Sequence, residues 1–235
     1  MTWAERHGPR RSGRPPRSVL VDLDLAGPGL DLLLGVEHEP GLRWPDLVAA
    51  PDDLDGGHLL GSLPAWRGTA VLATDRTRLV APSLGAVARV LGSLAEVADV
   101  VIDLPRGAWG TELGELVRAL PGAGAVWLAA PTLGSVGAGR RAGLAAGAAG
   151  VVLRAVRGAA LSPHEVATHL GVPLWAVARD ERALRVAADW GQGPVGARAR
   201  SSTARVDRVR GGSPSSLALV AAAVCAASDE ARGVR

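Results

Sequence analysis

Six short apolar runs rich in valine and alanine recur along the chain, and stretches with helical periodicity separate them. Runs that are apolar at successive positions are typical of parallel strands covered on both faces. Strands that alternate with helices form right-handed βαβ units. The sequence therefore predicts an α/β fold with a doubly wound, mainly parallel sheet and flanking helices. The predicted strands are residues 18–23, 69–73, 99–103, 125–130, 151–155 and 174–178.

Two of the helical segments begin with clear start signals. Ser83 and Ser162 stand where N-cap residues are expected. Pro163 then takes the first helical position, and Glu165 completes a capping box with Ser162. The predicted helices are residues 29–34, 55–63, 83–97, 112–120, 133–148, 162–170 and 181–188.

Composition divides the 235 residues into four parts. Residues 1–17 form an Arg/Pro-rich tail, and residues 18–190 are long enough for one α/β domain with a substantial core. Residues 191–216 are rich in Gly, Ser, Arg and Pro, which predicts a flexible linker. Residues 217–235 are predicted to be a C-terminal helix and tail. The apolar run 217–227 is too short to span a membrane and has almost no polar face, which favours core packing or self-association.

Two carboxylates end the first predicted strand. Asp22 and Asp24 are two residues apart, and a Gly/Pro turn follows them at residues 27–29. In a strand, side chains at this spacing point to the same face. The carboxyl ends of parallel strands are where open α/β sheets bind ligands. Carboxylates there can hold Mg²⁺ through water or position a water for attack on a phosphate. The alternative is that these acids end a strand and cap the next turn.

Several segments together resemble the MinD/ParA family of deviant P-loop ATPases, and more narrowly its CpaE-like, septum-site-determining members from actinobacteria. The similar segments are residues 21–35 (VDLDLAGPGLDLLLG), 99–107 (DVVIDLPRG), 125–132 (AVWLAAPT) and 162–174 (SPHEVATHLGVPL). The resemblance implies that Asp22 and Asp103 belong to the nucleotide and magnesium region. It implies that Asp24 positions the attacking water, and that Pro105 and Gly107 belong to a switch loop. Asp31 matches the family's acid before Leu-Leu-Gly.

The chain departs from the family where nucleotide phosphates would bind. It has no G-x-x-x-x-G-K-[ST] motif, and all 26 of its basic residues are arginine. Arginine does not replace the compact ammonium of a phosphate-loop lysine. The expected fold is therefore P-loop NTPase-like with the first strand and phosphate loop missing. Strands 18–23 and 99–103 must then pair directly or leave an open edge. Neutralising Asp22 or Asp103 is expected to be neutral or slightly stabilising, because clustered carboxylates repel.

The resemblance implies a spatial organiser of septum-site determination or of pilus or secretion-apparatus placement, non-catalytic and without a cofactor as the chain stands. The alternative is an active ATPase that starts upstream of Met1 and uses ATP and Mg²⁺. The expected partners are proteins of the division or pilus/secretion machinery, with a homodimer as a further form. The expected location is the cytoplasm, at the membrane periphery through partners. A lone Cys225 excludes an intramolecular disulfide and suits the reducing cytosol.

Three other motifs indicate different chemistry and are weaker. His164 and His169 lie five residues apart, whereas a zinc-protease helix needs four. Residues 137–142 fit a loose dinucleotide-binding pattern but begin too far after the preceding strand. The arginine cluster at 198–210 could bind nucleic acid in a salt-dependent manner, or form a solvated linker.

Overall fold

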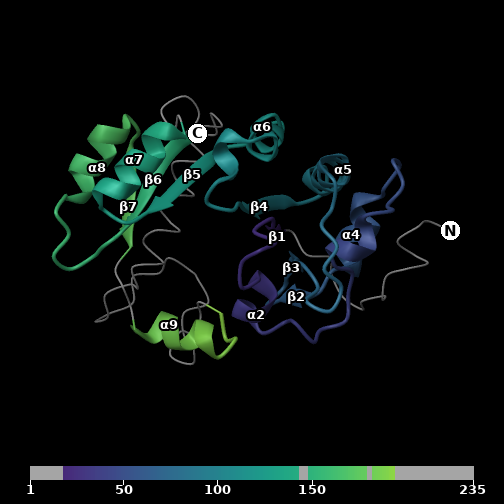
Figure 1. Ribbon diagram of the computed structural model, residues 1–235. Helices are drawn as coiled ribbons and strands as arrows, with labels where there is room; N and C mark the ends of the chain where they lie inside the picture. Colours follow the sequence, from purple (N-terminus) through teal and green to yellow (C-terminus); the bar gives the residue numbers. More distant parts are fainter. Residues whose placement is uncertain (1–17, 143–147, 179–181, 194–235) are drawn as a thin grey trace, which may run out of the picture. The chain divides into compact units, whose positions relative to one another are not determined.

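The computed structural model describes residues 18–142, 148–178 and 182–193, and these divide into two compact units (Figure 1). Unit 1 comprises the described residues up to Ala108 together with residues 182–193. Unit 2 comprises the described residues from Trp109 to 178. The predicted N-terminal tail, nearly all of the predicted linker and the predicted C-terminal helix lie outside the described residues.

Unit 1 is built on a four-stranded sheet in the order β2-β3-β1-β4. Strand β1 is parallel to β3 on one side and to β4 on the other, and β2 pairs antiparallel with β3. The strands are β1 (Ser18–Asp22), β2 (Ala65–Trp66), β3 (Thr69–Leu72) and β4 (Asp99–Asp103). The direct β1–β4 pairing was one of the two expected arrangements. Among the described residues β4 also forms the sheet edge, where Val101 is 58% exposed.

Both faces of the unit 1 sheet carry buried apolar side chains. Val19 and Val21 of β1 are fully buried on one face. On the other face, Leu20 and Val71 pack with Leu34 of the first helix. This two-sided burial explains why the β1 run is apolar at successive positions. The helices of this unit are α2 (Leu30–Leu34), α3 (Trp44–Leu47), α4 (Gly56–Ser62), α5 (Leu84–Ala95) and α9 (Arg182–Asp189).

Unit 2 is a three-stranded parallel sheet in the order β5-β6-β7, with helices packed on it. Val151 and Leu153 in the central strand form its core with Val166 and Leu170. Its elements are α6 (Glu112–Arg118), β5 (Ala125–Ala129), α7 (Leu133–Arg141), β6 (Ala148–Arg154), α8 (Pro163–Leu170) and β7 (Leu174–Ala178). A short 3₁₀ turn, Ala108–Gly110, precedes α6.

The predicted α/β class and parallel strands are confirmed, as are both predicted helix caps. The Ser83 hydroxyl accepts the Ala86 amide, and Ser162 and Glu165 form the reciprocal capping box. The prediction for 133–148 was too long at its C-terminal end, since α7 ends at Arg141 and β6 already begins at Ala148. The short elements α3 and β2 were not predicted because four and two residues carry no readable periodicity. No helix in the described ranges has both the length and the apolar character to cross a membrane.

Candidate functional site

The predicted acids meet at the carboxyl ends of β1 and β4 in unit 1. Asp22 is the last residue of β1, Asp103 is the last residue of β4, and the parallel register pairs them directly. Partners in register place their side chains on the same face of a sheet. Asp24 follows two residues after Asp22, and its negative charge contributes to raising the pKa of both other carboxyls. The sequence therefore located a cluster of three carboxylates that interact with one another.

Asp22 organises the loop that follows β1. It is 1% exposed, and each of its carboxylate oxygens accepts a backbone amide. Oδ1 accepts from the Asp24 amide at 3.0 Å, and Oδ2 accepts from the Leu30 amide at 2.8 Å. Burial raises the pKa of this carboxyl, and the two amide bonds oppose that rise. Removing the carboxylate would leave both amides without their acceptor, so the expectation that Asp22 can be neutralised without harm is revised.

The loop between β1 and α2 requires glycine at one place. The Asp24 carboxylate folds back over Gly27, where an added Cβ would lie 2.7 Å from Oδ2 of Asp24, but this side chain could move aside. Gly29 has a φ of 86°, a left-handed conformation that L side chains rarely adopt. The Gly/Pro turn seen in the sequence thus reverses the chain, so that the Leu30 amide at the start of α2 reaches the Asp22 carboxylate.

Asp103 and Asp24 are the carboxylates best placed to meet a ligand. Asp103 is exposed, and Asp24 is partly buried. In the described part of the chain, no group of three or more His, Cys, Asp or Glu side chains is arranged to hold a metal ion. Mg²⁺ usually keeps several waters and takes only one or two protein carboxylates. Asp103 and Asp24 fit this mode of binding through water, whereas both oxygens of Asp22 already serve backbone amides.

Asp103→Asn is expected to increase stability at neutral pH relative to the wild type. Although Asp103 is exposed overall, its carboxyl is partly desolvated, and this together with the Asp24 charge raises its pKa in the folded state. A raised carboxyl pKa contributes stability below the unfolded-state pKa, near 4, and that contribution is lost as pH rises through the folded pKa. Urea unfolding at pH 3 and pH 7 checks this. The unfolding free energy of the variant relative to that of the wild type should rise between pH 3 and pH 7. The same difference in unfolding free energy at both pH values would show that folding does not shift the pKa of Asp103.

A second layer of charged residues supports the loop and was not predicted as part of the site. Asp31 of α2 is buried, and its Oδ2 accepts from Arg76 after β3 at 2.8 Å. Arg43 is buried too, and it donates to the Val36 carbonyl at 2.8 Å. The contact between Asp31 and Arg76 spans 45 residues, so no local pattern in the sequence could reveal it.

The turn after β3 is fixed by Asp75 and Arg78. Thr77 and Arg78 donate to the Asp75 carboxylate, and these hydrogen bonds hold its pKa below the usual range. Arg78 also forms an ion pair with Asp46. The side chains are partly exposed, so the network adds little to global stability. Its effect is to hold Arg76 and Arg78 beside the carboxyl end of the sheet.

The predicted switch loop follows Asp103 directly. The Ala108 amide donates to the Pro105 carbonyl at 2.9 Å, which closes a turn across Gly107. A Cβ at Gly107 would meet open space, so packing does not demand glycine there. The loop lies immediately before the boundary between the two units at Ala108.

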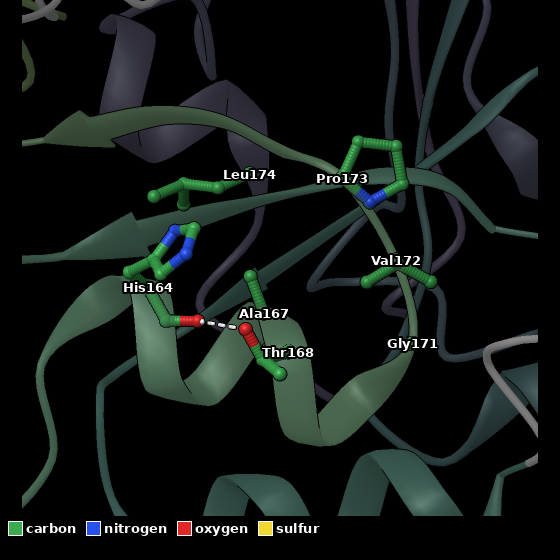
Figure 2. Close-up of a pocket in the computed structure, with 7 residues that line it drawn as sticks. All are labelled: His164, Ala167, Thr168, Gly171, Val172, Pro173 and Leu174. Carbon is green, nitrogen blue, oxygen red and sulfur yellow. Dashed lines mark hydrogen bonds between the residues drawn. The ribbon is translucent and has the colours of Figure 1, made fainter.

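The competing motifs of unit 2 have structural explanations. His164 and Glu165 stand in the first turn of α8, where Glu165 caps the helix through the Ser162 amide. Residues 137–141 lie inside α7, so they do not form a phosphate-binding turn. A hollow of about 370 Å³ lies between α8 and the start of β7. Figure 2 shows the residues that line it, which are His164, Ala167, Thr168, Gly171, Val172, Pro173 and Leu174. The Thr168 hydroxyl in this hollow donates a hydrogen bond to the His164 carbonyl.

Comparison with known sequences identifies two relatives. No model of a known protein family matches the chain. The chain is 38% identical, over 89 residues, to each of two uncharacterised proteins from strains of Mycobacterium tuberculosis. This segment is 38% of the chain and 25% of each relative, so the chain spans about a quarter of the length of these curated relatives.

Comparison with solved structures identifies the fold. A ParA family ATPase from Chlorobium tepidum is similar with a TM-score of 0.67, at 16% identity over 91% of this chain and 86% of that one. A chain of the MinC:MinD cell division protein complex from Aquifex aeolicus is similar with a TM-score of 0.64, at 15% identity over 90% of this chain and 83% of that one. MinD with Mg-ADP from Pyrococcus horikoshii is similar with a TM-score of 0.54, at 19% identity over 92% of this chain and 83% of that one. The chain therefore has the α/β fold of the ParA/MinD P-loop ATPases.

Proposed function

We propose that this chain is a MinD/ParA-like spatial organiser of the CpaE type, acting in septum-site determination or in placing a pilus or secretion apparatus. We further propose that the chain as it stands does not turn over ATP. The ParA/MinD fold supports the first part. The second part is supported by the carboxylate cluster at the ends of β1 and β4, in a chain whose 26 basic residues are all arginine.

The arrangement of charges carries the proposal. Phosphoryl transfer depends on positioning and on neutralising phosphate charge. Asp22, Asp24 and Asp103 add negative charge where a triphosphate would lie. Arg76 and Arg78 at the neighbouring strand end are both paired with acids. In this proposal Asp24 and Asp103 keep the water-positioning and magnesium-region places of the family, Asp22 shapes the loop between them, and Pro105 and Gly107 form the switch loop.

An active ATPase is the second candidate. The matched segment is only a quarter of each relative, so the whole protein's activity is a separate proposal. In this reading an upstream phosphate loop supplies the lysine and the backbone amides, and ATP with Mg²⁺ binds against Asp24 and Asp103.

Protein partners follow from the same proposal. One of the similar structures is a MinC:MinD complex, which shows that this fold can carry a protein partner in that case. We propose partners from the division or pilus/secretion machinery, a homodimer as a further form, and a cytoplasmic protein that reaches the membrane periphery through its partners.

The purified chain is expected to release phosphate from Mg-ATP at the background rate. Phosphate release and thermal melting, each with and without Mg-ATP, are the two measurements. A ligand that binds the folded state raises the melting temperature, so an unchanged melt is expected. Asp24→Ala serves as the matched control and should change neither the rate of phosphate release nor the effect of Mg-ATP on the melting temperature.

Two other results would favour other readings. Steady phosphate release that Asp24→Ala abolishes would establish the ATPase. Salt-sensitive binding of DNA without nucleotide would instead favour the nucleic-acid reading of the arginine cluster at 198–210.

A further inference from the structure

One face of the unit 2 sheet is covered by a helix of the same unit. Val151 and Leu153 of β6 lie on this face and pack against Val166 and Leu170 of α8. Side chains alternate between the two faces along a strand, so Val152 of β6 points to the opposite face.

The opposite face is apolar and one of its large side chains is open. The register pairs Leu128 of β5 with Val152, so these two side chains share the face. The Trp175 ring lies there too, because a Cβ added at Gly150 would run into it. Val152 in the central strand is only 4% exposed, whereas Leu128 on the edge strand β5 is 74% exposed. Parallel sheets are normally covered on both faces, so we expect an apolar segment to pack over Leu128.

The same chain contains a segment of suitable composition outside the described residues. Residues 217–227 are eleven uncharged residues, six of them alanine, and they are apolar all round. A helix of that kind is stable only when it is buried. As a helix the segment would be about 16 Å long, which is also roughly the length of a five-residue strand such as β5. The 23 residues from 194 to 216 that precede this segment can extend over roughly 75 Å.

We propose that residues 217–227 dock on this face of the unit 2 sheet at its β5 edge and cover Leu128, with small alanine side chains allowing close approach beside Trp175. The C-terminal segment is then a part of this chain that completes the apolar packing around Leu128. This proposal is independent of the proposed function, since it concerns neither the carboxylate cluster nor nucleotide.

The single cysteine of the chain provides a direct test. Cys225 lies within the docking segment, so Leu128→Cys in the full chain should form an intramolecular disulfide with it under mild oxidation. The matched control is Leu133→Cys. Leu133 is 71% exposed and begins α7, which contacts α8 on the already covered face. Non-reducing electrophoresis and peptide mapping should show a link between the introduced thiol and Cys225 in the first variant and no such link in the control.

A second measurement uses the native thiol. Cys225 should react slowly with a thiol reagent in the folded wild type. Leu128→Glu should make it react roughly tenfold faster, since burying one leucine shifts a docking equilibrium by that factor or more. Leu133→Glu should leave the rate unchanged. A disulfide-linked dimer in place of the intramolecular product would assign the face to a second copy and overturn the proposal, and so would Cys225 labelling that is equally fast in all three proteins.

Discussion

Trp44→Ala is expected to lower the free energy of unfolding of unit 1 by about 3–5 kcal/mol, the range for truncating a buried tryptophan. Trp44 is fully buried at the start of α3. Its indole Nε1 donates to the Asp22 carbonyl at 2.7 Å, and its amide donates to the Ala73 carbonyl at 3.1 Å. The substitution therefore creates a cavity and removes a hydrogen bond at the strand end that carries the candidate site. Urea unfolding followed by far-UV circular dichroism measures the loss.

Two companion substitutions separate the causes. Trp44→Phe keeps most of the buried ring but leaves the Asp22 carbonyl without its donor, and it should cost about 1–3 kcal/mol. Trp190→Ala removes a tryptophan that is largely exposed and should have little effect. If Trp44→Ala costs no more than Trp190→Ala, then α3 does not pack on β1 in solution.

Asp22→Ala is expected to cost about 2–3 kcal/mol of unfolding free energy, because amide groups left without a partner each cost about 1–3 kcal/mol. The Asp24 and Leu30 amides both lose their acceptor. Burial raises the pKa of the Asp22 carboxyl, so removing this carboxyl also removes an unfavourable buried charge. This gain offsets part of the loss, and the expected cost therefore lies toward the lower end of the range for two unpaired amides. Asp22→Asn should fall between the wild type and Asp22→Ala, since its one carbonyl oxygen can accept one of the two amides.

The matched control for Asp22→Ala is Asp99→Ala. Asp99 is exposed and begins β4, at the opposite end of the same strand pair. Its replacement should change the unfolding free energy by less than about 0.5 kcal/mol. Equal effects at the two positions would mean that the loop does not depend on Asp22. A stabilised Asp22→Asn would restore the simpler view that clustered carboxylates only repel one another.

The candidate site was only partly predictable from the sequence. The positions of Asp22, Asp24 and Asp103 follow from where apolar runs end, and such ends can be read locally. The role of Asp22 could not be read in this way, because it depends on the Leu30 amide eight residues later and on the indole of Trp44. The pairing of Asp31 with Arg76 spans 45 residues and has no local pattern at all.

The sequence by itself determined the six parallel strands and the two capped helices. These features depend on side-chain alternation and on hydrogen bonds between near neighbours, which a short window of residues contains. Only the tertiary structure decided that β1 pairs with both β3 and β4, that β5, β6 and β7 form a separate sheet, and that α9 returns to contact α2. Strand order and the choice of buried partner depend on contacts between segments far apart in the chain, and no local pattern of residues encodes them.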